Sequence, residues 1–198
     1  MNNQTINVIG AGLAGCECAW QLAERGFKVN LHEMKPIKHS PAHKSDKMCE
    51  IVCSNSFGGT ELSTGAGLLK AEMQKLNSLI IAVAKKHLVP AGGAMAVDRD
   101  AFSNEIHNVI SNHKNINIIN QEVTDINTEE ITVIATGPLT SDNLSTSLKK
   151  LLGEDFLYFY DAAAPIISAE SINIFSVVSG PVAMIVIASF SSVLTSSQ

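Results

Sequence analysis

The chain has 198 residues, which is enough to bury one good core or one domain with an appendage. Its formal net charge of −5 argues against a generally basic nucleic-acid binder and leaves room only for a local basic patch. All four cysteines lie within the first 53 residues, and residues 1–4 lack the basic region of a secretory signal. We therefore expect a cytoplasmic protein with reduced thiols.

The start of the chain predicts a βαβ unit. The β-branched run Thr5–Ile9 is typical of a buried parallel strand. A helix is expected over Leu13–Glu24, where Gly26 then breaks it, and a second strand is expected over Lys28–Glu33. The whole unit is about 30 residues long, which is the size of a mononucleotide-binding half.

The middle of the chain predicts a long loop followed by helices. Residues 34–67 have no clear period, and a loop of that length tends to be functional or disordered. One long helix is expected over 68–86, because apolar residues recur there at helical spacing. These residues are Leu69, Met73, Leu76, Ile80 and Val83. A turn at 90–93 and a strand at 94–97 follow, and Asp98 can cap a helix over 99–112.

Short extended runs dominate the next part of the sequence. We expect them at 116–119, 122–126 and 131–135, the last leading into a tight turn, and another apolar run covers 157–167. Strands that alternate with helices in this way predict an α/β class with a Rossmann-like dinucleotide-binding domain.

A glycine motif opens the first helix. Gly10-x-Gly12-x-x-Gly15 follows a strand, and Glu33 ends the next strand about 20 residues on. The first glycine permits a tight turn, the second lets a pyrophosphate approach the backbone, and the third allows close helix packing. The helix N-terminus attracts phosphate, and Glu33 can accept hydrogen bonds from ribose hydroxyls. The predicted cofactor-binding residues are Gly10, Ala11, Gly12, Leu13, Ala14, Gly15, Glu33, Thr136 and Gly137.

These residues alone leave the choice between FAD and NAD open. A later strand that ends in Ala135-Thr136-Gly137 favours FAD, because it is similar to the second fingerprint of two-dinucleotide-type flavoproteins.

Several short sequence motifs, called blocks here, occur in an order that is typical of one protein family. They are GAGLAG (10–15), EMKP (33–36), SPAH (40–43), VCSNS (52–56), GLLKxEM (67–73), PAGGAxAVDR (90–99), IATGPLTS (134–141) and LYFYDAAAPI (157–166). With them the chain resembles the TrmFO family of folate- and FAD-dependent tRNA (uracil-5-)-methyltransferases, relatives of the GidA/MnmG flavoproteins. The resemblance covers residues 5 to about 172 and implies an FAD-binding domain of the two-dinucleotide type, here incomplete.

The resemblance also implies a reaction. Reduced FAD takes a methylene carbon from 5,10-methylenetetrahydrofolate and passes it to C5 of a uridine in the tRNA T-loop, while NAD(P)H supplies the reducing equivalents. A cysteine thiolate adds to C6 of the uracil. Cys53, in the VCSNS block, matches the first of the two family cysteines, and the second has no counterpart in this sequence.

The remaining candidate residues have competing interpretations. Cys53 can be this catalytic thiol or a small buried hydrophobe. Cys49 and Cys53 could share a helix face as zinc ligands, but no second Cys/His pair follows and no metal site is expected. Cys16 and Cys18 are expected to pack. One basic stretch can meet tRNA phosphates or a folate glutamate tail, or form a solvated loop. It comprises Lys35, Lys38, His39, His43, Lys44 and Lys47.

The end of the chain departs from the family blocks. No charged residue follows Glu170, and residues 172–194 are long enough to span a bilayer. Pro181, Gly180 and several serines lower the mean hydropathy, however, so no stable membrane association is expected. We predict an FAD-binding region over 1–172 and, over 173–198, a poorly ordered tail that arises from a frameshift or truncation.

Three hypotheses about function follow. The first is an enzyme with the TrmFO-type reaction. The second is a catalytically inactive truncated fragment with residual nucleotide binding. The third, a GidA/MnmG-like tRNA uridine-modification flavoprotein, is disfavoured by the SPAH, VCSNS and PAGGAxAVDR blocks.

Overall fold

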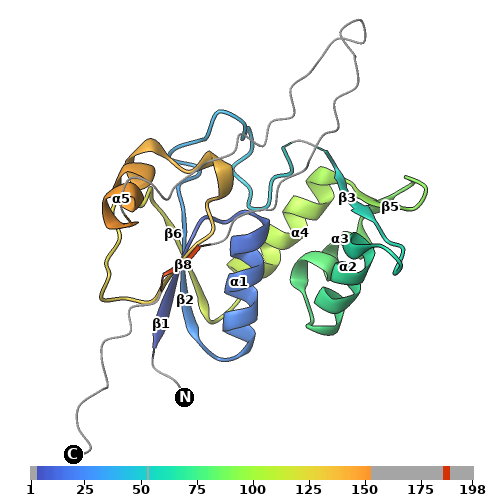
Figure 1. Cartoon of the computed structure of the whole chain (residues 1–198), viewed down its shortest axis with the longest axis horizontal. Helices are drawn as coiled ribbons and strands as arrows, with labels where there is room; N and C mark the ends of the chain where they lie inside the picture. Colours follow the sequence, from blue (N-terminus) through green and yellow to red (C-terminus); the bar gives the residue numbers. More distant parts are fainter. Residues whose placement is uncertain (1–3, 53, 153–184, 188–198) are drawn as a thin grey trace, which may run out of the picture.

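A five-stranded sheet forms the centre of the computed structural model, which describes residues 4–52, 54–152 and 185–187 (Figure 1). The strands lie in the order β6-β2-β1-β7-β8. Their bounds are β1 Thr5–Ile9, β2 Lys28–Glu33, β6 Ile116–Asn120, β7 Thr132–Ile134 and β8 Ile185–Ile187. The first four are parallel, and β8 pairs antiparallel with β7 at the edge. This arrangement confirms the predicted Rossmann-like α/β class.

The sheet is buried on both faces, because alternate residues of its strands pack into separate apolar clusters. Val8 and Val133 lie in the larger cluster with α1 (Leu13–Glu24), whereas Ile9 and Ile134 lie in the smaller one with α5 (Asp142–Leu152). In Figure 1 these two helices accordingly flank the sheet on opposite sides. The first βαβ unit therefore has the predicted bounds and the burial that its apolar strands require.

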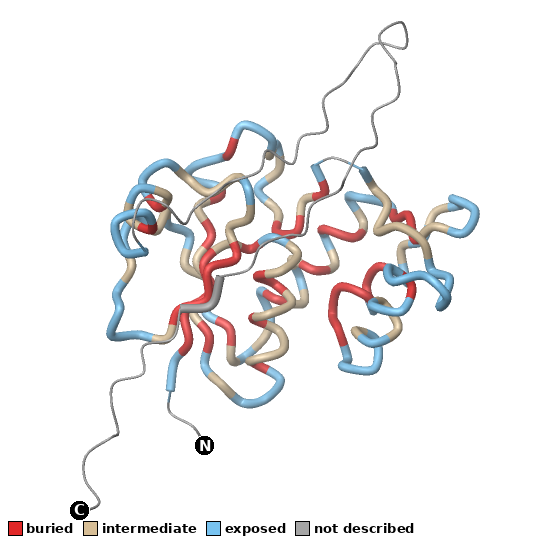
Figure 2. The backbone as a smooth tube through the Cα atoms, in the orientation of Figure 1, coloured by how far each residue is buried: buried red, intermediate tan, exposed pale blue. Residues whose placement is uncertain are grey.

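Small residues let α1 approach the sheet closely. The buried residues of this helix are Gly15, Cys16, Ala19 and Ala23, which form a narrow stripe with little side-chain volume. In Figure 2 the buried segments concentrate along the sheet strands and the inner sides of the helices. The start of α1 is thereby held against the carboxyl ends of the strands, where the site lies.

A second group of elements extends beyond α1 (Figure 1). It contains a three-stranded antiparallel sheet in the order β3-β5-β4, with bounds Ser56–Gly59, Ala94–Val97 and Leu88–Val89. It also contains α2 (Gly65–Lys75), α3 (Leu79–Lys86) and α4 (Arg99–Ser111). Phe102, Ile106 and Ile110 of α4 are fully buried in the larger cluster and join this group to the main sheet. Asp98 caps α4 as predicted, since its Oδ1 accepts from Ala101 N at 2.9 Å.

The single helix expected over 68–86 is wrong, because the chain breaks at 76–78. Asn77 adopts a left-handed φ of 58°, and Ser78 starts α3 by accepting from Ile81 N. Glu17 of α1 holds the break, since its Oε2 accepts from Ser78 Oγ at 2.9 Å and from Ile80 N at 3.0 Å. Asparagine tolerates the left-handed region and serine favours N-caps, so both residues suit a break that tertiary contacts then fix.

Several other expectations need correction. The loop expected over 34–67 contains β3, and α2 begins at Gly65. The run 122–126 forms no strand, and β7 is shorter than the run 131–135. Leu69 and Leu76, expected on an apolar helix face, are 56% and 62% exposed. The apolar run 157–167 lies outside the described residues, and so does most of the tail, apart from β8.

We expect Ser78→Ala to lower the free energy of unfolding by about 1–2 kcal/mol, because it removes the cap of α3 and leaves Glu17 without one partner. Urea unfolding at pH 7 measures this. Ser63→Ala is the matched control, because Ser63 is exposed and has no side-chain hydrogen bond among the described contacts. Equal stability of the two variants would contradict the role of the cap.

Candidate functional site

A cleft opens at the carboxyl ends of the parallel strands. The loops after β1, β2, β6 and β7 contribute Gly10–Gly12, Glu33–Lys35, Gln121–Val123 and Ala135–Thr136, and the cleft encloses about 690 Å³ including its mouth. β1 lies between β2 and β7, so the chain leaves β1 for one neighbour and returns much later on the other side. In open parallel sheets, ligands bind at such a switch in strand order.

The glycine turn forms the floor of the cleft, and two of its glycines are required by the protein itself. Gly10 has a left-handed φ of 97°, and a β-carbon there would lie 2.8 Å from the carbonyl oxygen of Ala135. A β-carbon on Gly15 would lie 1.7 Å from the carbonyl oxygen of Gly10. Backbone atoms cause both clashes, so no side-chain rearrangement can relieve them.

Gly12 is different, because no protein atom demands a glycine there. Its backbone is extended, with φ −76° and ψ −171°, and a β-carbon would meet no atom within 4 Å. Gly12 lines the cleft and is the N-cap of α1, whose first turn has no side-chain cap. Open space over an uncapped helix start fits a diphosphate held by backbone N–H groups. Gly12 therefore leaves room for a ligand at the start of α1.

Glu33 joins two walls of the cleft. The residue is 8% exposed, and its carboxylate accepts from Ala11 N through Oε2 and from Lys35 N through Oε1, both at 3.0 Å. Each oxygen retains a further lone pair, so the group can still accept hydrogen bonds from ligand hydroxyls. The geometry supports the ribose-binding role predicted for Glu33.

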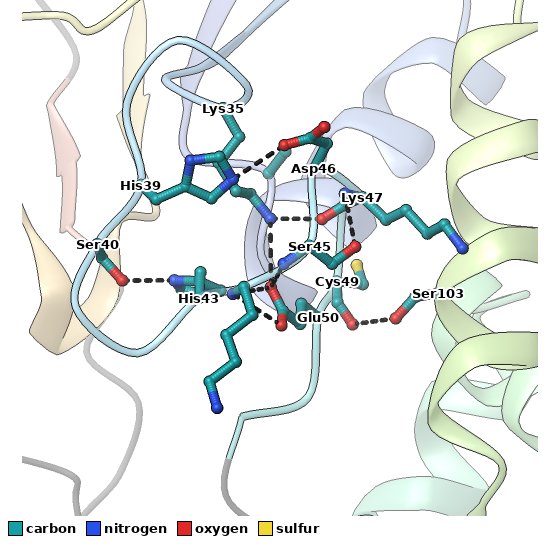
Figure 3. Close-up of polar contacts among 12 residues, drawn as sticks. Lys35, His39, Ser40, His43, Ser45, Asp46, Lys47, Cys49, Glu50 and Ser103 are labelled. Carbon is teal, nitrogen blue, oxygen red and sulfur yellow. Dashed lines mark hydrogen bonds and ion pairs between the residues drawn. The ribbon is translucent and has the colours of Figure 1, made fainter.

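The loop over residues 35–50, called here the strap, covers one side of the cleft (Figure 3). Lys35, only 4% exposed, donates through Nζ to the Lys47 carbonyl and lies 4.0 Å from a Glu50 oxygen. Glu50 in turn accepts from Lys44 N and Ser45 N. A buried ammonium loses several kcal/mol of hydration, which an ion pair at this distance does not offset alone. These contacts therefore fix the conformation of the strap.

At the mouth of the cleft the strap contacts the end of β6 and the loop that follows it. Lys38 Nζ pairs with Glu122 Oε1 at 2.7 Å, and this hydrogen bond is the main cause that lowers the pKa of Glu122. Asn120 Nδ2 donates to the Lys35 carbonyl at 2.6 Å. Lys35, Lys38 and His39, which pairs with Asp46, are thus engaged within the protein. The basic stretch in the sequence is accordingly not one continuous cationic surface.

Cys49 ties the strap to the glycine turn and to α4. Its N–H donates to the Ala11 carbonyl at 2.9 Å, and its carbonyl accepts from Ser103 Oγ at 3.0 Å. Cys49 lies in a turn with φ 53°, so the expectation that it shares a helix face with Cys53 is wrong. Burial raises the pKa of the Cys49 thiol well above its ordinary value, and the adjacent Cys16 thiol adds to this, so Cys49 is a packed, unreactive group.

The structure brings most of the predicted binding residues together. Gly10, Ala11, Gly12, Glu33 and Thr136 line the cleft. Leu13, Ala14 and Gly15 form the first turn of α1, and Gly137 begins the short 3-10 helix η1 (Gly137–Leu139) beside the cleft. Cys53 lies outside the described residues.

Another set of residues lines the cleft without having been predicted there from the sequence. They are His43, Cys49, Glu50, Gln121, Glu122, Val123, Leu139, Thr140, Ser141 and Leu144. His43 stands in the SPAH block and Leu139–Ser141 belong to the IATGPLTS block, so these two blocks were usable signals, whereas Cys49 and Glu50 stand between the SPAH and VCSNS blocks. No local pattern marked Gln121–Val123, because only strand order brings that loop to the cleft.

The fold and the cleft define a dinucleotide-binding domain of the Rossmann-like class. A family model described as glucose inhibited division protein A matches residues 5–194. The chain belongs to this family. The solved GidA structure from Aquifex aeolicus agrees in fold, with a TM-score of 0.51 at 20% identity over 64% of this chain and 21% of that one.

Curated relatives confirm the TrmFO resemblance. The methylenetetrahydrofolate–tRNA-(uracil-5-)-methyltransferase TrmFO of Bacillus subtilis (strain 168) is 58% identical over 173 residues, which are 87% of this chain and 40% of that protein. TrmFO of Aquifex aeolicus (strain VF5) is 58% identical over 170 residues, 86% of this chain and 38% of that protein. The chain thus spans about two fifths of the length of these relatives. The division at residue 172 stays a prediction.

Gly15→Ala should cost about 3 kcal/mol or more of unfolding free energy or prevent folding, because its β-carbon would overlap a backbone carbonyl. Gly12→Ala should cost less than about 1 kcal/mol, since its β-carbon meets open space. Denaturant unfolding of both variants tests the contrast. Equal destabilisation by the two substitutions would contradict the backbone clash at Gly15 and the open space at Gly12.

Burial lowers the pKa of His32 and of His43, with the nearby Lys35 as the second cause at His43. The unfolded chain then binds protons on these rings at a higher pH than the folded chain does. Stability should therefore fall as the pH drops from about 7 through about 6.5, the ordinary histidine value, toward the lowered folded values. Urea unfolding at several pH values should give a shallower slope for His32→Gln/His43→Gln, and an unchanged slope would count against this assignment.

Proposed function

We propose that the cleft binds FAD, with the diphosphate over Gly12 at the start of α1 and a ribose at Glu33. The observation that carries this proposal is Gly12, a glycine that faces open space in the cleft and that no protein contact requires. Glu33 supports it, because its buried carboxylate is oriented by two backbone N–H groups and keeps acceptor capacity toward the cleft.

We propose further that the protein takes part in folate- and FAD-dependent methylation of uridine at C5 in the tRNA T-loop. The 58% identity to TrmFO proteins supports this activity, and the name of these relatives includes both methylenetetrahydrofolate and tRNA. When bound, FAD would supply the redox chemistry, with 5,10-methylenetetrahydrofolate as carbon donor and NAD(P)H as reductant. A cytoplasmic location agrees with such a tRNA substrate. Among the described residues, no helix is both long and apolar enough to cross a membrane.

The residues of this chain have separate tasks in the proposal. The glycine turn, Glu33, Thr136 and Gly137 hold the cofactor, while the strap shields one side of the cleft from water. Cys53 is proposed as the thiolate that adds to C6 of the uracil, on the strength of the VCSNS block alone. Cys16 and Cys49 are unsuited to that task, because both are buried.

FAD titration of the purified chain, followed by flavin fluorescence, tests the cofactor. Gly12→Ala should weaken binding about tenfold or more, because a methyl group over the helix start disturbs charge-assisted bonds to phosphate. Gly65→Ala is the matched control, since Gly65 also faces open space but lies in α2, away from the cleft. Equal affinity of Gly12→Ala and the wild type would contradict the proposed diphosphate position.

The activity needs its own assay. Purified chain is incubated with FAD, NADPH, labelled methylenetetrahydrofolate and unmodified tRNA. Label at the T-loop uridine that is lost in Cys53→Ala is the result expected of the enzyme. FAD binding without any transfer of label would favour the inactive-fragment hypothesis over the enzyme.

A further inference from the structure

The Ser40–His43 pair in the strap has no part in the function proposed so far. Ser40 is 7% exposed, and its Oγ lies 2.6 Å from His43 Nδ1 (Figure 3). The backbone reinforces the pair, because His43 N donates to the Ser40 carbonyl at 3.2 Å. His43 also lines the cleft, whereas its neighbour His39 does not. The ring is therefore fixed in place beside the space where a ligand would lie.

The hydrogen-bond partners of Ser40 indicate which nitrogen of the His43 ring carries the proton. Among the described residues the buried Ser40 hydroxyl has no other hydrogen-bond partner, so within the protein its proton is satisfied by donation to Nδ1. The pKa of His43 is lowered, first by burial and then by Lys35, which favours the neutral ring near pH 7. A neutral ring that accepts at Nδ1 carries its hydrogen on Nε2. No described residue bonds Nε2, so this donor is available.

The surroundings of His43 define the kind of acceptor that it can serve. The charged groups that act on the ring are Lys35, Glu50, Glu33 and His39, and all four already have partners within the strap or the glycine turn. Glu33 is the proposed ribose ligand, so His43 lies near the adenosine diphosphate half of the cleft. An N–H donor in this position suits a phosphate or ribose oxygen.

We propose that His43 is a binding residue for the adenosine diphosphate half of the dinucleotide, to which it donates an Nε2–H hydrogen bond, and that Ser40 positions its ring. This inference rests on the proposed cofactor site. It assigns a ligand contact to the SPAH block and explains why a serine and a histidine stand three residues apart on the strap beside the cleft. Ser40 is a positioning residue, because it acts only through the ring.

Calorimetric titration with ADP and with FAD tests the contact. His43→Ala should weaken the binding of both ligands about tenfold, which is typical of a lost hydrogen bond to a charged group. His43→Gln, which keeps an N–H donor, should recover most of that loss. His39→Ala is the matched control, since His39 belongs to the same strap and pairs with Asp46 away from the cleft lining. Thermal unfolding of each ligand-free variant verifies that it is folded.

A second measurement needs no ligand. Nitrogen-15 NMR of the ligand-free chain should find His43 as the neutral Nε2–H tautomer, and Ser40→Ala should shift the ring toward a mixture of tautomers. Ser40→Ala should also weaken ADP binding, but less than His43→Ala does. An Nδ1–H tautomer in the wild type would overturn the role of Ser40.

The outcomes separate the two proposals. If the wild type binds neither FAD nor ADP, the cofactor proposal fails and this inference fails with it. If the wild type binds both and His43→Ala binds them equally well, only this inference is overturned. If His43→Ala weakens FAD but leaves ADP unchanged, the contact lies outside the adenosine diphosphate half, which also overturns the inference as stated.

Discussion

The buried carboxylate of Glu33 organises the site, because it connects the glycine turn to the start of the strap. One oxygen accepts from Ala11 in the glycine turn and the other from Lys35 at the start of the strap. A buried carboxylate without such partners would carry a large desolvation penalty, so the two N–H groups fix its position and it fixes theirs. Together with the bond from Cys49 N to the Ala11 carbonyl, this group holds the strap against the glycine turn.

The strap is likewise stabilised by hydrogen bonds among its own buried polar groups. Lys35, Glu50 and the backbone of residues 44–47 satisfy one another, while Cys49 is bonded to the glycine turn and to Ser103 of α4. A non-glycine residue with φ 53° is held in that conformation only when its surroundings determine it. The left-handed turn at Cys49 is therefore a result of packing between the strap, α1 and α4. These contacts of the strap also hold His43 in a fixed position.

Local sequence was a good guide where chain neighbours decide the structure. The first βαβ unit has the predicted bounds, and Asp98 caps its helix, because apolar period and capping chemistry act over a few residues. The helix over 68–86 failed for the opposite reason. Its apolar spacing continues through 76–78, but Glu17, distant in sequence, bonds Ser78 and Ile80 and stabilises the break. The loop 121–123 could not be assigned to the cleft, since only strand order brings it there.

The sequence by itself determined the α/β class, the glycine turn with Glu33, and membership of a family whose blocks run along most of the chain. These features depend on residue type and spacing. Tertiary structure alone decided that Gly12 faces open space while Gly10 and Gly15 touch backbone, that Cys49 is buried, and that Ser40 holds the ring of His43 at the cleft. The physical reason is that burial, clashes and hydrogen-bond partners depend on atoms far away in the sequence, which no local pattern records.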